Sequence, residues 1–198
     1  EEVPRMIEIL SSIGVKIKWK SENTIELDSS EKLNLNNIHK KACESTRASL
    51  LLMGALAGRK KGTYRLYKSG GCKLGKRTVR PHVYALEKLG VHIESKIKYY
   101  EVTNKNQTAA NIVMYEAGDT PTENAIMAAV LTPGTTTIKF ASANYMVQDL
   151  CYFLRIAGAK IEGIGTTSLT ITGVKKLNPV DSYSIMPDPI EAFAWVSL

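Results

Sequence analysis

The sequence predicts a mixed α/β (α+β) fold in which repeated helix–strand units surround buried helices. In three places a helix-like segment ends at a glycine and a strand-like segment follows; these glycines are Gly14, Gly90 and Gly158. A second marker is an apolar helix with a proline in its first turn, which begins near Thr120 and again near Asp188. The spacing from Thr120 to Asp188 equals the spacing from Gly90 to Gly158, so two independent markers indicate one repeat.

The segments around the three glycines predict a surface helix followed by a strand. Before each glycine, apolar residues recur at i, i+3 and i+4, which is typical of an amphipathic helix. A glycine just past the last turn suits the left-handed conformation that ends many helices. After Gly14, Val15 and Ile17 alternate with polar residues, which predicts a half-buried strand.

The second kind of helix carries a capping signal. We expect Thr120 to be the N-cap, Pro121 to take the first helical position and Glu123 to complete a capping box. Asp188 begins a segment with the same pattern. The stretches 50–56 and 125–131 are almost wholly apolar, and helices of that composition are expected in the interior.

These elements predict one domain, 1–198, of incomplete repeats. The expected boundaries are a partial unit at 1–30, whole units at 40–104 and 110–174, and the first helix of another unit at 186–198. Because the chain starts and ends within a unit, we expect a piece of a larger protein. The final apolar helix, 188–198, should fill the slot of the missing first helix or allow self-association with a neighbouring chain.

Composition excludes several classes of protein. No apolar run approaches the roughly 18 residues of a membrane helix, and no signal peptide is evident, so a cytoplasmic protein is expected. Cys43, Cys72 and Cys151 are odd in number and far apart, which argues against disulfides and against a metal site. The net charge of +7 favours an anionic partner, which could be a nucleic acid, a nucleotide sugar or a phosphorylated metabolite.

Cys72 is the first candidate for chemistry. Its segment, "KSGGCKLGKR", places the thiol among glycines and cations, with Lys68, Lys73 and Arg77 within five positions. Neighbouring cations lower a thiol pKa from about 8.5, which increases the reactive thiolate fraction. The glycines would let the loop close over a ligand. Cys43 and Cys151 lie in apolar, helix-like segments and are expected to be packing residues.

Several segments, taken in order, resemble the enolpyruvyl transferases. They are "STRASLLLMGALAG", "SGGCKLGKR", "HVYALEKLG", "TENAIMAAVLTPGTT" and "LRIAGAKIEGIGTTSLTITGV". The resemblance covers the whole chain but about half of the family's length. It implies an inside-out α/β barrel domain, in which helix–strand units surround buried helices, and a second, similar domain that is absent here.

Within the family the chain is most similar to the branch that acts on UDP-N-acetylglucosamine. That resemblance implies transfer of the enolpyruvyl group of phosphoenolpyruvate to the 3-hydroxyl of the sugar, with release of phosphate, as the first committed step of peptidoglycan synthesis. No cofactor or metal is implied. Cys72 would be the catalytic general acid, and fosfomycin would alkylate it. Because the cleft of the family lies between two domains, we expect the chain alone to be inactive.

The resemblance also implies a set of substrate-binding residues. They are Arg47, Arg77, Thr78, Val79, Arg80, Pro81, His82, Gly118 and Asp119. Arg47 stands at an expected helix start, which is unfavourable for a cation unless an anion binds there. Gly118 and Asp119 would contribute backbone N–H groups.

Departures from the family pattern keep other functions open. Arg80 stands where the family has an acidic residue, Glu116 where it often has lysine, and Pro189 where it has arginine. One alternative is therefore a nucleotide-sugar-binding protein of the same fold that has lost turnover. Others are the shikimate-pathway enolpyruvyl transferase, which does not rely on a loop cysteine, and an RNA-directed relative. Aromatic residues make up only 7% of the chain, which argues against single-stranded nucleic acid as the partner.

Overall fold

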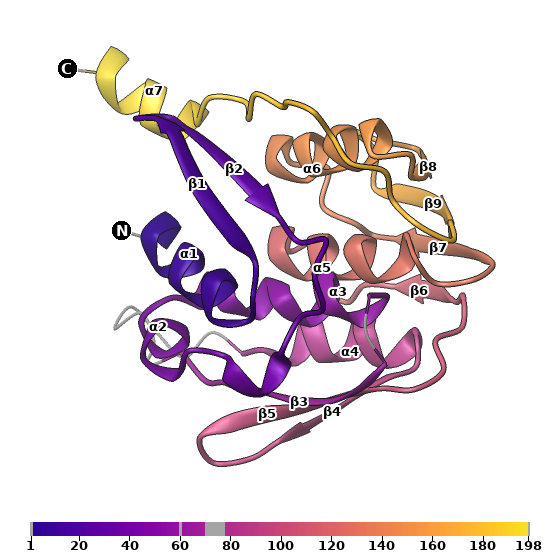
Figure 1. Ribbon diagram of the computed structural model, residues 1–198. Coiled ribbons are helices and arrows are strands. Elements are labelled where there is room, and N and C mark those ends of the chain that lie inside the picture. The colour runs from indigo at the N-terminus through magenta and orange to yellow at the C-terminus, as the bar shows by residue number, and fades with distance from the viewer. Residues whose placement is uncertain (1, 60, 70–77, 198) are drawn as a thin grey trace.

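The computed structural model describes residues 2–59, 61–69 and 78–197 (Figure 1). The helical elements are α1 Glu2–Ser12, η1 Leu35–Asn37, α2 Lys40–Ser45, η2 Arg47–Leu51, α3 Leu52–Ala57, α4 Arg80–Lys88, α5 Asp119–Ala129, α6 Tyr145–Ile156 and α7 Pro189–Val196. The strands are β1 Lys16–Ser21, β2 Thr24–Asp28, β3 Gly62–Tyr67, β4 Val91–Ser95, β5 Tyr99–Asn104, β6 Asn111–Val113, β7 Thr135–Lys139, β8 Lys160–Glu162 and β9 Ser168–Thr172.

Helices lie inside and sheets outside. Figure 1 shows α3, α4 and α5 in the middle of the molecule, with the β3–β5–β4 sheet along one edge and the β6–β7–β9–β8 sheet along another. Most of α3 and α5 is buried, including Met53, Ala125 and Ile126 with no exposed surface. The predicted buried helices are therefore confirmed. The apolar residues that the sequence places on them form one continuous core with the inner faces of the sheets.

The two larger sheets share one strand order. β3 and β4 both pair antiparallel with β5, and β7 and β8 both pair antiparallel with β9. In each case the first strand follows a buried helix and the second follows an amphipathic one. β6 adds a parallel edge strand to β7. The hairpin of β1 and β2 is largely exposed, and of the strand predicted after Gly14 only Val15 and Ile17 are removed from solvent.

The three glycine-terminated helices end as the sequence predicts. Gly14, Gly90 and Gly158 have φ of +101°, +84° and +96°, which side chains with a Cβ rarely adopt. Each glycine N–H donates to a carbonyl of the preceding turn, at 3.0 Å for Gly90 to Glu87. The left-handed cap reverses the chain direction and sends each following strand back along its helix.

The predicted cap at Thr120 is wrong. Helix α5 begins two residues earlier than this cap implies, at Asp119, with Gly118 as its N-cap and no side-chain capping bond. The hydroxyl of Thr122 donates to the Gly118 carbonyl at 2.7 Å, and the Asp119 carboxylate turns toward the loop before α6. Pro121 still fits because the first-turn N–H groups of a helix need no intrahelical partner. At Asp188 the prediction is confirmed, since its carboxylate accepts from the Ile190 N–H at 2.9 Å.

The expectation that the last helix fills a slot in this domain is also wrong. None of the residues of α7 is buried, and Phe193 and Trp195 are each 73% exposed. The segment before it contacts α6: the Tyr183 hydroxyl donates to the Asp149 carboxylate at 2.7 Å, the Tyr183 ring packs edge-on against Phe153, and a hydrogen bond of 3.3 Å joins Tyr145 to Asp188. The core around α3 and α5 is formed without α7, since none of the residues of that helix belongs to the cluster of buried residues.

The contact between α3 and α5 is unusually close. A Cβ placed on Gly54 would lie 2.3 Å from the carbonyl oxygen of Asn124 and 2.7 Å from its Cα. The same asparagine is fully buried and accepts a hydrogen bond from the Gly54 N–H at 2.8 Å. Glycine is therefore required at position 54 by space and not by backbone conformation.

We expect Gly54→Ala to lower the free energy of unfolding by at least ~2 kcal/mol, because the added methyl group forces the two helices apart. In an unconstrained helix the same change is stabilising by about 1 kcal/mol. The sign of the change in unfolding free energy therefore distinguishes a steric clash from helix propensity. Urea unfolding followed by circular dichroism measures the difference. The matched control is Ala55→Gly at the exposed neighbouring position, which should cost about 1 kcal/mol from propensity alone. A Gly54→Ala variant as stable as the wild type would contradict the close contact.

Candidate functional site

The described candidate residues lie at the starts of three helical elements. Arg47 begins η2, the segment 78–82 leads into α4, and Gly118 and Asp119 begin α5. Cys72 and Arg77, the predicted acid and one predicted phosphate ligand, lie outside the described residues. The structure therefore bears on the substrate-binding part of the prediction and leaves the role of the thiol as a prediction.

Arg47 is close enough to His82 for its charge to act on the imidazole. Thr46 caps η2, since its hydroxyl accepts from the Ala48 N–H at 3.1 Å, and this fixes the helix start from which Arg47 extends. The positive charge of Arg47 acts on two neighbours from different elements. It lowers the pKa of His82 and opposes the burial that raises the pKa of Tyr100.

The segment 78–82 forms a tight entry into α4. The hydroxyl of Thr78 accepts from the Arg80 N–H at 3.1 Å, and Val79 is the N-cap. Pro81 lies in the first turn, where its missing N–H costs nothing. Thr78 and Arg80 are exposed while Pro81 and His82 are buried, so the helix start presents one cation outward and turns the imidazole inward.

His82 is buried against α5. It is only 3% exposed, and its Nδ1 lies 2.7 Å from Nδ2 of Asn124, while its Nε2 lies 3.4 Å from the hydroxyl of Thr120. Burial, and then the charge of Arg47, lower its pKa to about 4. The imidazole is therefore neutral at physiological pH, and it connects the starts of α4 and α5.

Asp119 has a structural task in addition to its place at the helix start. Its carboxylate accepts from the Ser142 hydroxyl and, at 2.9 Å, from the Asn144 side-chain amide. The Ser142 N–H in turn donates to Thr122 at 3.1 Å. The acidic side chain thus holds the loop before α6, and what Asp119 can offer a ligand is its backbone N–H.

Arg80, Glu116 and Tyr115 form the outer rim. Burial and the charge of Glu116 raise the pKa of Tyr115, and the charge of Arg80 opposes them, so both charges lie close to the phenol. Tyr115 packs edge-on against Tyr84 of α4, with ring centroids 5.4 Å apart, and remains 49% exposed. Sequence reasoning missed Tyr115. Its only signal was an aromatic residue next to the divergent Glu116.

Sequence reasoning also missed Asn124. A carboxamide in the otherwise apolar run "TENAIMAAVL" is itself a signal, since buried polar groups need hydrogen-bond partners. Asn124 supplies three contacts: with Gly54, Leu50 and His82, at 2.8, 3.0 and 2.7 Å.

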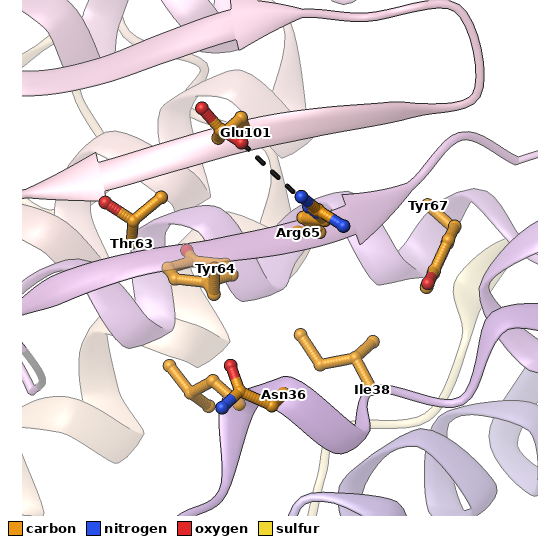
Figure 2. A pocket seen from close by; sticks show the side chains of 8 residues that line it. Asn36, Ile38, Thr63, Tyr64, Arg65, Tyr67 and Glu101 are labelled. Atoms are coloured by element: carbon orange, nitrogen blue, oxygen red, sulfur yellow. Dashed lines mark ion pairs between the residues drawn. The ribbon is translucent and has the colours of Figure 1, made fainter.

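The cavity drawn in Figure 2 is separate from these residues. It has a volume of about 410 Å³ and lies between η1 and the β3–β5 pair, lined by Leu35, Asn36, Ile38, Thr63, Tyr64, Arg65, Tyr67 and Glu101. Its one ion pair joins Arg65 to Glu101 at 3.9 Å. None of the candidate residues within the described ranges lines it, so it gives no support to the predicted site.

The two described cysteines are packing residues, as predicted. Cys43 and Cys151 are both buried, and burial raises the pKa of each thiol to about 11. Within residues 2–59, 61–69 and 78–197, no group of His, Cys, Asp and Glu side chains is arranged to hold a metal ion. No helix in the same ranges combines the length and the apolar character that crossing a membrane requires.

The class of protein follows from comparison with known families. The sequence profile described as EPSP synthase (3-phosphoshikimate 1-carboxyvinyltransferase) matches residues 1–198, and the chain belongs to this family of enolpyruvyl transferases. Among solved structures, the enolpyruvyl transferase NikO from Streptomyces tendae aligns with a TM-score of 0.82 at 24% identity, over 98% of this chain and 46% of that one. An EPSP synthase from Acinetobacter baumannii aligns with a TM-score of 0.66 at 14% identity, over 88% and 40%. The predicted fold class is confirmed.

Within the family, the curated relatives are UDP-N-acetylglucosamine 1-carboxyvinyltransferases. The protein of that name from Hydrogenovibrio crunogenus is 37% identical over 197 residues, which are 100% of this chain and 46% of the relative. The one from Legionella pneumophila is 38% identical over 193 residues, or 96% and 38%. The predicted resemblance is therefore confirmed, and the chain spans less than half the length of these relatives.

His82 should make stability depend on pH. Its folded pKa of about 4 lies below the roughly 6.5 of an unfolded histidine, so between these values the unfolded chain binds a proton that the folded chain excludes. Lowering the pH from 7 to 5 should therefore cost the wild type about 2 kcal/mol more than it costs His82→Gln. Urea unfolding at both pH values measures this difference. His92→Gln, at an exposed strand position, should behave like the wild type; equal losses in wild type and His82→Gln would contradict the buried neutral imidazole.

Proposed function

We propose that this chain is one domain of an enzyme that transfers the enolpyruvyl group of phosphoenolpyruvate to the 3-hydroxyl of UDP-N-acetylglucosamine. The observation that carries the proposal is the convergence of Arg47, His82 and the start of α5, at positions that the resemblance assigns to the nucleotide sugar. The relatives that carry this activity in their name support it. The proposed domain arrangement is 1–198 with whole units at 40–104 and 110–174, completed by a second domain of the same parent protein.

The candidate residues would bind different parts of the nucleotide sugar and of phosphoenolpyruvate. Arg47 and Arg77 would bind phosphate oxygens through their guanidinium groups, which can form paired hydrogen bonds. The backbone N–H groups of the first turn of α5, at Asp119 and Thr120, have no intrahelical partner and can donate to an anion. Thr78, Val79, Arg80 and Pro81 would cradle the nucleotide, and Gly118 would let it approach the helix start.

Cys72 would protonate the methylene carbon of phosphoenolpyruvate while the sugar hydroxyl adds to the neighbouring carbon and gives its proton to a phosphate oxygen. Cleavage of the C–O bond would then release the protonated phosphate from the tetrahedral intermediate and regenerate the enolpyruvyl double bond. The thiolate would recover its proton as the methyl group is deprotonated. Neighbouring cations favour the thiolate, which is the form that must exist after proton transfer.

Helix α7 supports a second domain. It is apolar, and its large apolar side chains are exposed; they are Ile190, Phe193, Trp195 and Val196. Exposed apolar surface of this kind marks an interface. We assign it to the contact with the second domain, and self-association through 188–198 is the alternative when that domain is lacking.

A catalytically inactive nucleotide-sugar-binding protein is the second candidate. The observation that favours it is Glu116, an exposed carboxylate two residues before the N-cap of α5. A negative charge there weakens phosphate binding at the helix start. The two functions differ in whether the bound sugar is turned over.

In the complete gene product, Cys72→Ala should lower the rate of phosphate release from the two substrates by about 10²- to 10⁴-fold, as expected for loss of a general acid. Arg47→Ala should instead act mainly on the KM for the nucleotide sugar, because it removes a charge-assisted hydrogen bond. Cys151→Ala and Arg155→Ala are matched controls away from the site and should leave the rate nearly unchanged. A Cys72→Ala enzyme of wild-type rate would disprove the assigned acid.

Thiol labelling separates the two candidate functions. With UDP-N-acetylglucosamine bound, fosfomycin should alkylate Cys72 of the complete gene product, and peptide mass spectrometry should find Cys43 and Cys151 unmodified because both are buried with raised pKa. Absence of alkylation together with normal nucleotide-sugar binding would favour the binding protein. The 198-residue chain alone should show no turnover, since half of the proposed cleft belongs to the second domain.

A further inference from the structure

The side-chain amide of Asn124 has a fixed orientation. Its Oδ1 accepts from the Gly54 N–H at 2.8 Å and its Nδ2 donates to the Leu50 carbonyl at 3.0 Å. A backbone N–H can only donate and a carbonyl can only accept, so exchanging the oxygen and the nitrogen of the amide would break both bonds. These two backbone groups are i and i−4 partners in a regular α-helix, and the amide lies at the junction where η2 becomes α3.

The fixed amide determines where His82 carries its proton. The second hydrogen of Nδ2 points to Nδ1 of His82, 2.7 Å away, so Nδ1 must be an acceptor. The hydrogen of the neutral ring is therefore on Nε2. A second proton on Nδ1 would set two donors against each other in a buried site, which agrees with the lowered pKa of His82.

The Nε2–H of His82 faces the hydroxyl of Thr120 at 3.4 Å. When the Thr120 oxygen accepts this hydrogen, its own hydrogen turns away from the imidazole. Thr120 is exposed, and among the described residues its side chain makes no other hydrogen bond. The hydroxyl is thus a donor directed outward at the first turn of α5.

The charges around Thr120 favour an anionic acceptor. Arg47 is close enough to lower the pKa of His82, and the first-turn N–H groups of α5 carry partial positive charge. The neighbouring carboxylate of Asp119 is occupied by Ser142 and Asn144 on the side of α6. The carboxylate of Glu116 lies close to Gly118, since a Cβ built on that glycine would be 3.1 Å from Glu116 Oε1, so its negative charge opposes the cation and the N–H groups at the helix start.

We propose that Asn124 is a positioning residue that fixes His82 as a neutral Nε2–H donor, and that Thr120 thereby presents its hydroxyl hydrogen to a phosphate oxygen bound at the start of α5. The inference deepens the proposed function, on which its ligand rests. Asn124 donates to His82, and His82 donates to Thr120. The Thr120 hydroxyl therefore remains a hydrogen-bond donor toward the site around neutral pH.

The first test reads the tautomer directly. In the complete gene product labelled with ¹⁵N-histidine, long-range ¹H–¹⁵N spectra at pH 7 should show His82 with hydrogen on Nε2 and none on Nδ1; His82→Gln assigns the signals, and His92→Gln identifies those of an exposed histidine for comparison. Asn124→Asp keeps the acceptor for Gly54 and removes the donor to His82, so a proton should appear on Nδ1. Hydrogen on Nδ1 in the wild type, or an unchanged tautomer in a folded Asn124→Asp protein, would overturn the proposal.

The second test measures the donor at Thr120. Calorimetric binding of UDP-N-acetylglucosamine and, separately, of phosphoenolpyruvate identifies which phosphate it meets. Thr120→Val, which has nearly the same shape, should weaken one of the two by about 3- to 10-fold, as for loss of one hydrogen bond, and Thr120→Ser should restore it. A Thr120→Val protein that binds both compounds like the wild type would overturn the role of Thr120.

The two tests keep this inference separate from the proposed function. The tautomer and the binding constants require no turnover, so an inactive gene product with hydrogen on Nε2 and a Thr120-dependent phosphate contact supports the inference and refutes the proposed reaction. An active enzyme in which Asn124→Asp leaves the tautomer unchanged does the reverse.

Discussion

The structure depends on one buried contact, in which the amide of Asn124 lies against the backbone of Leu50 and Gly54. It brings α3 and α5 so close that position 54 has no room for a Cβ. A buried amide is costly unless its hydrogen bonds are made, and here each of the three partners is supplied by another part of the chain. Sliding or rotating either helix would break these bonds together, so the contact fixes the relative position of the two helices. The starts of α4 and α5, and with them His82 and Thr120, follow from it.

Features that depend on neighbours in the chain could be predicted from the sequence. The three positive-φ glycines, the amphipathic helices before them and the cap at Asp188 are set by local sterics and local hydrogen bonds. The buried helices could be predicted because an apolar surface has to leave water wherever the helix is placed. The repeat spacing then implied that similar segments form similar layers, and the strand orders of the two larger sheets agree with this.

Features decided by distant groups could not be predicted in this way. Thr120 looks like a cap in the sequence, but Asp119 hydrogen-bonds with Ser142 and Asn144, and the helix starts two residues earlier than a Thr120 cap implies. The hydrogen bonds of Asn124 join it to residues that lie 70, 74 and 42 positions away. No local pattern indicates such partners. The site residues themselves came from the family resemblance, and the structure adds how Arg47, His82 and the start of α5 meet.

The departures at Arg80 and Glu116 are better understood as a pair than as two losses. The resemblance implies an acidic residue at the first position and a lysine at the second, and this chain has the opposite charge at each. Both charges act on the pKa of Tyr115, so both lie at the same part of the rim. Exchanging the two signs leaves the net charge of the rim unchanged and reverses the direction of the dipole between the two side chains. Arg80 begins α4, and Glu116 lies beside Gly118, the N-cap of α5. A hydrogen-bond donor at the rim therefore faces Glu116, and an acceptor faces Arg80. The divergence moves the negative charge of the rim from the start of α4 to the start of α5.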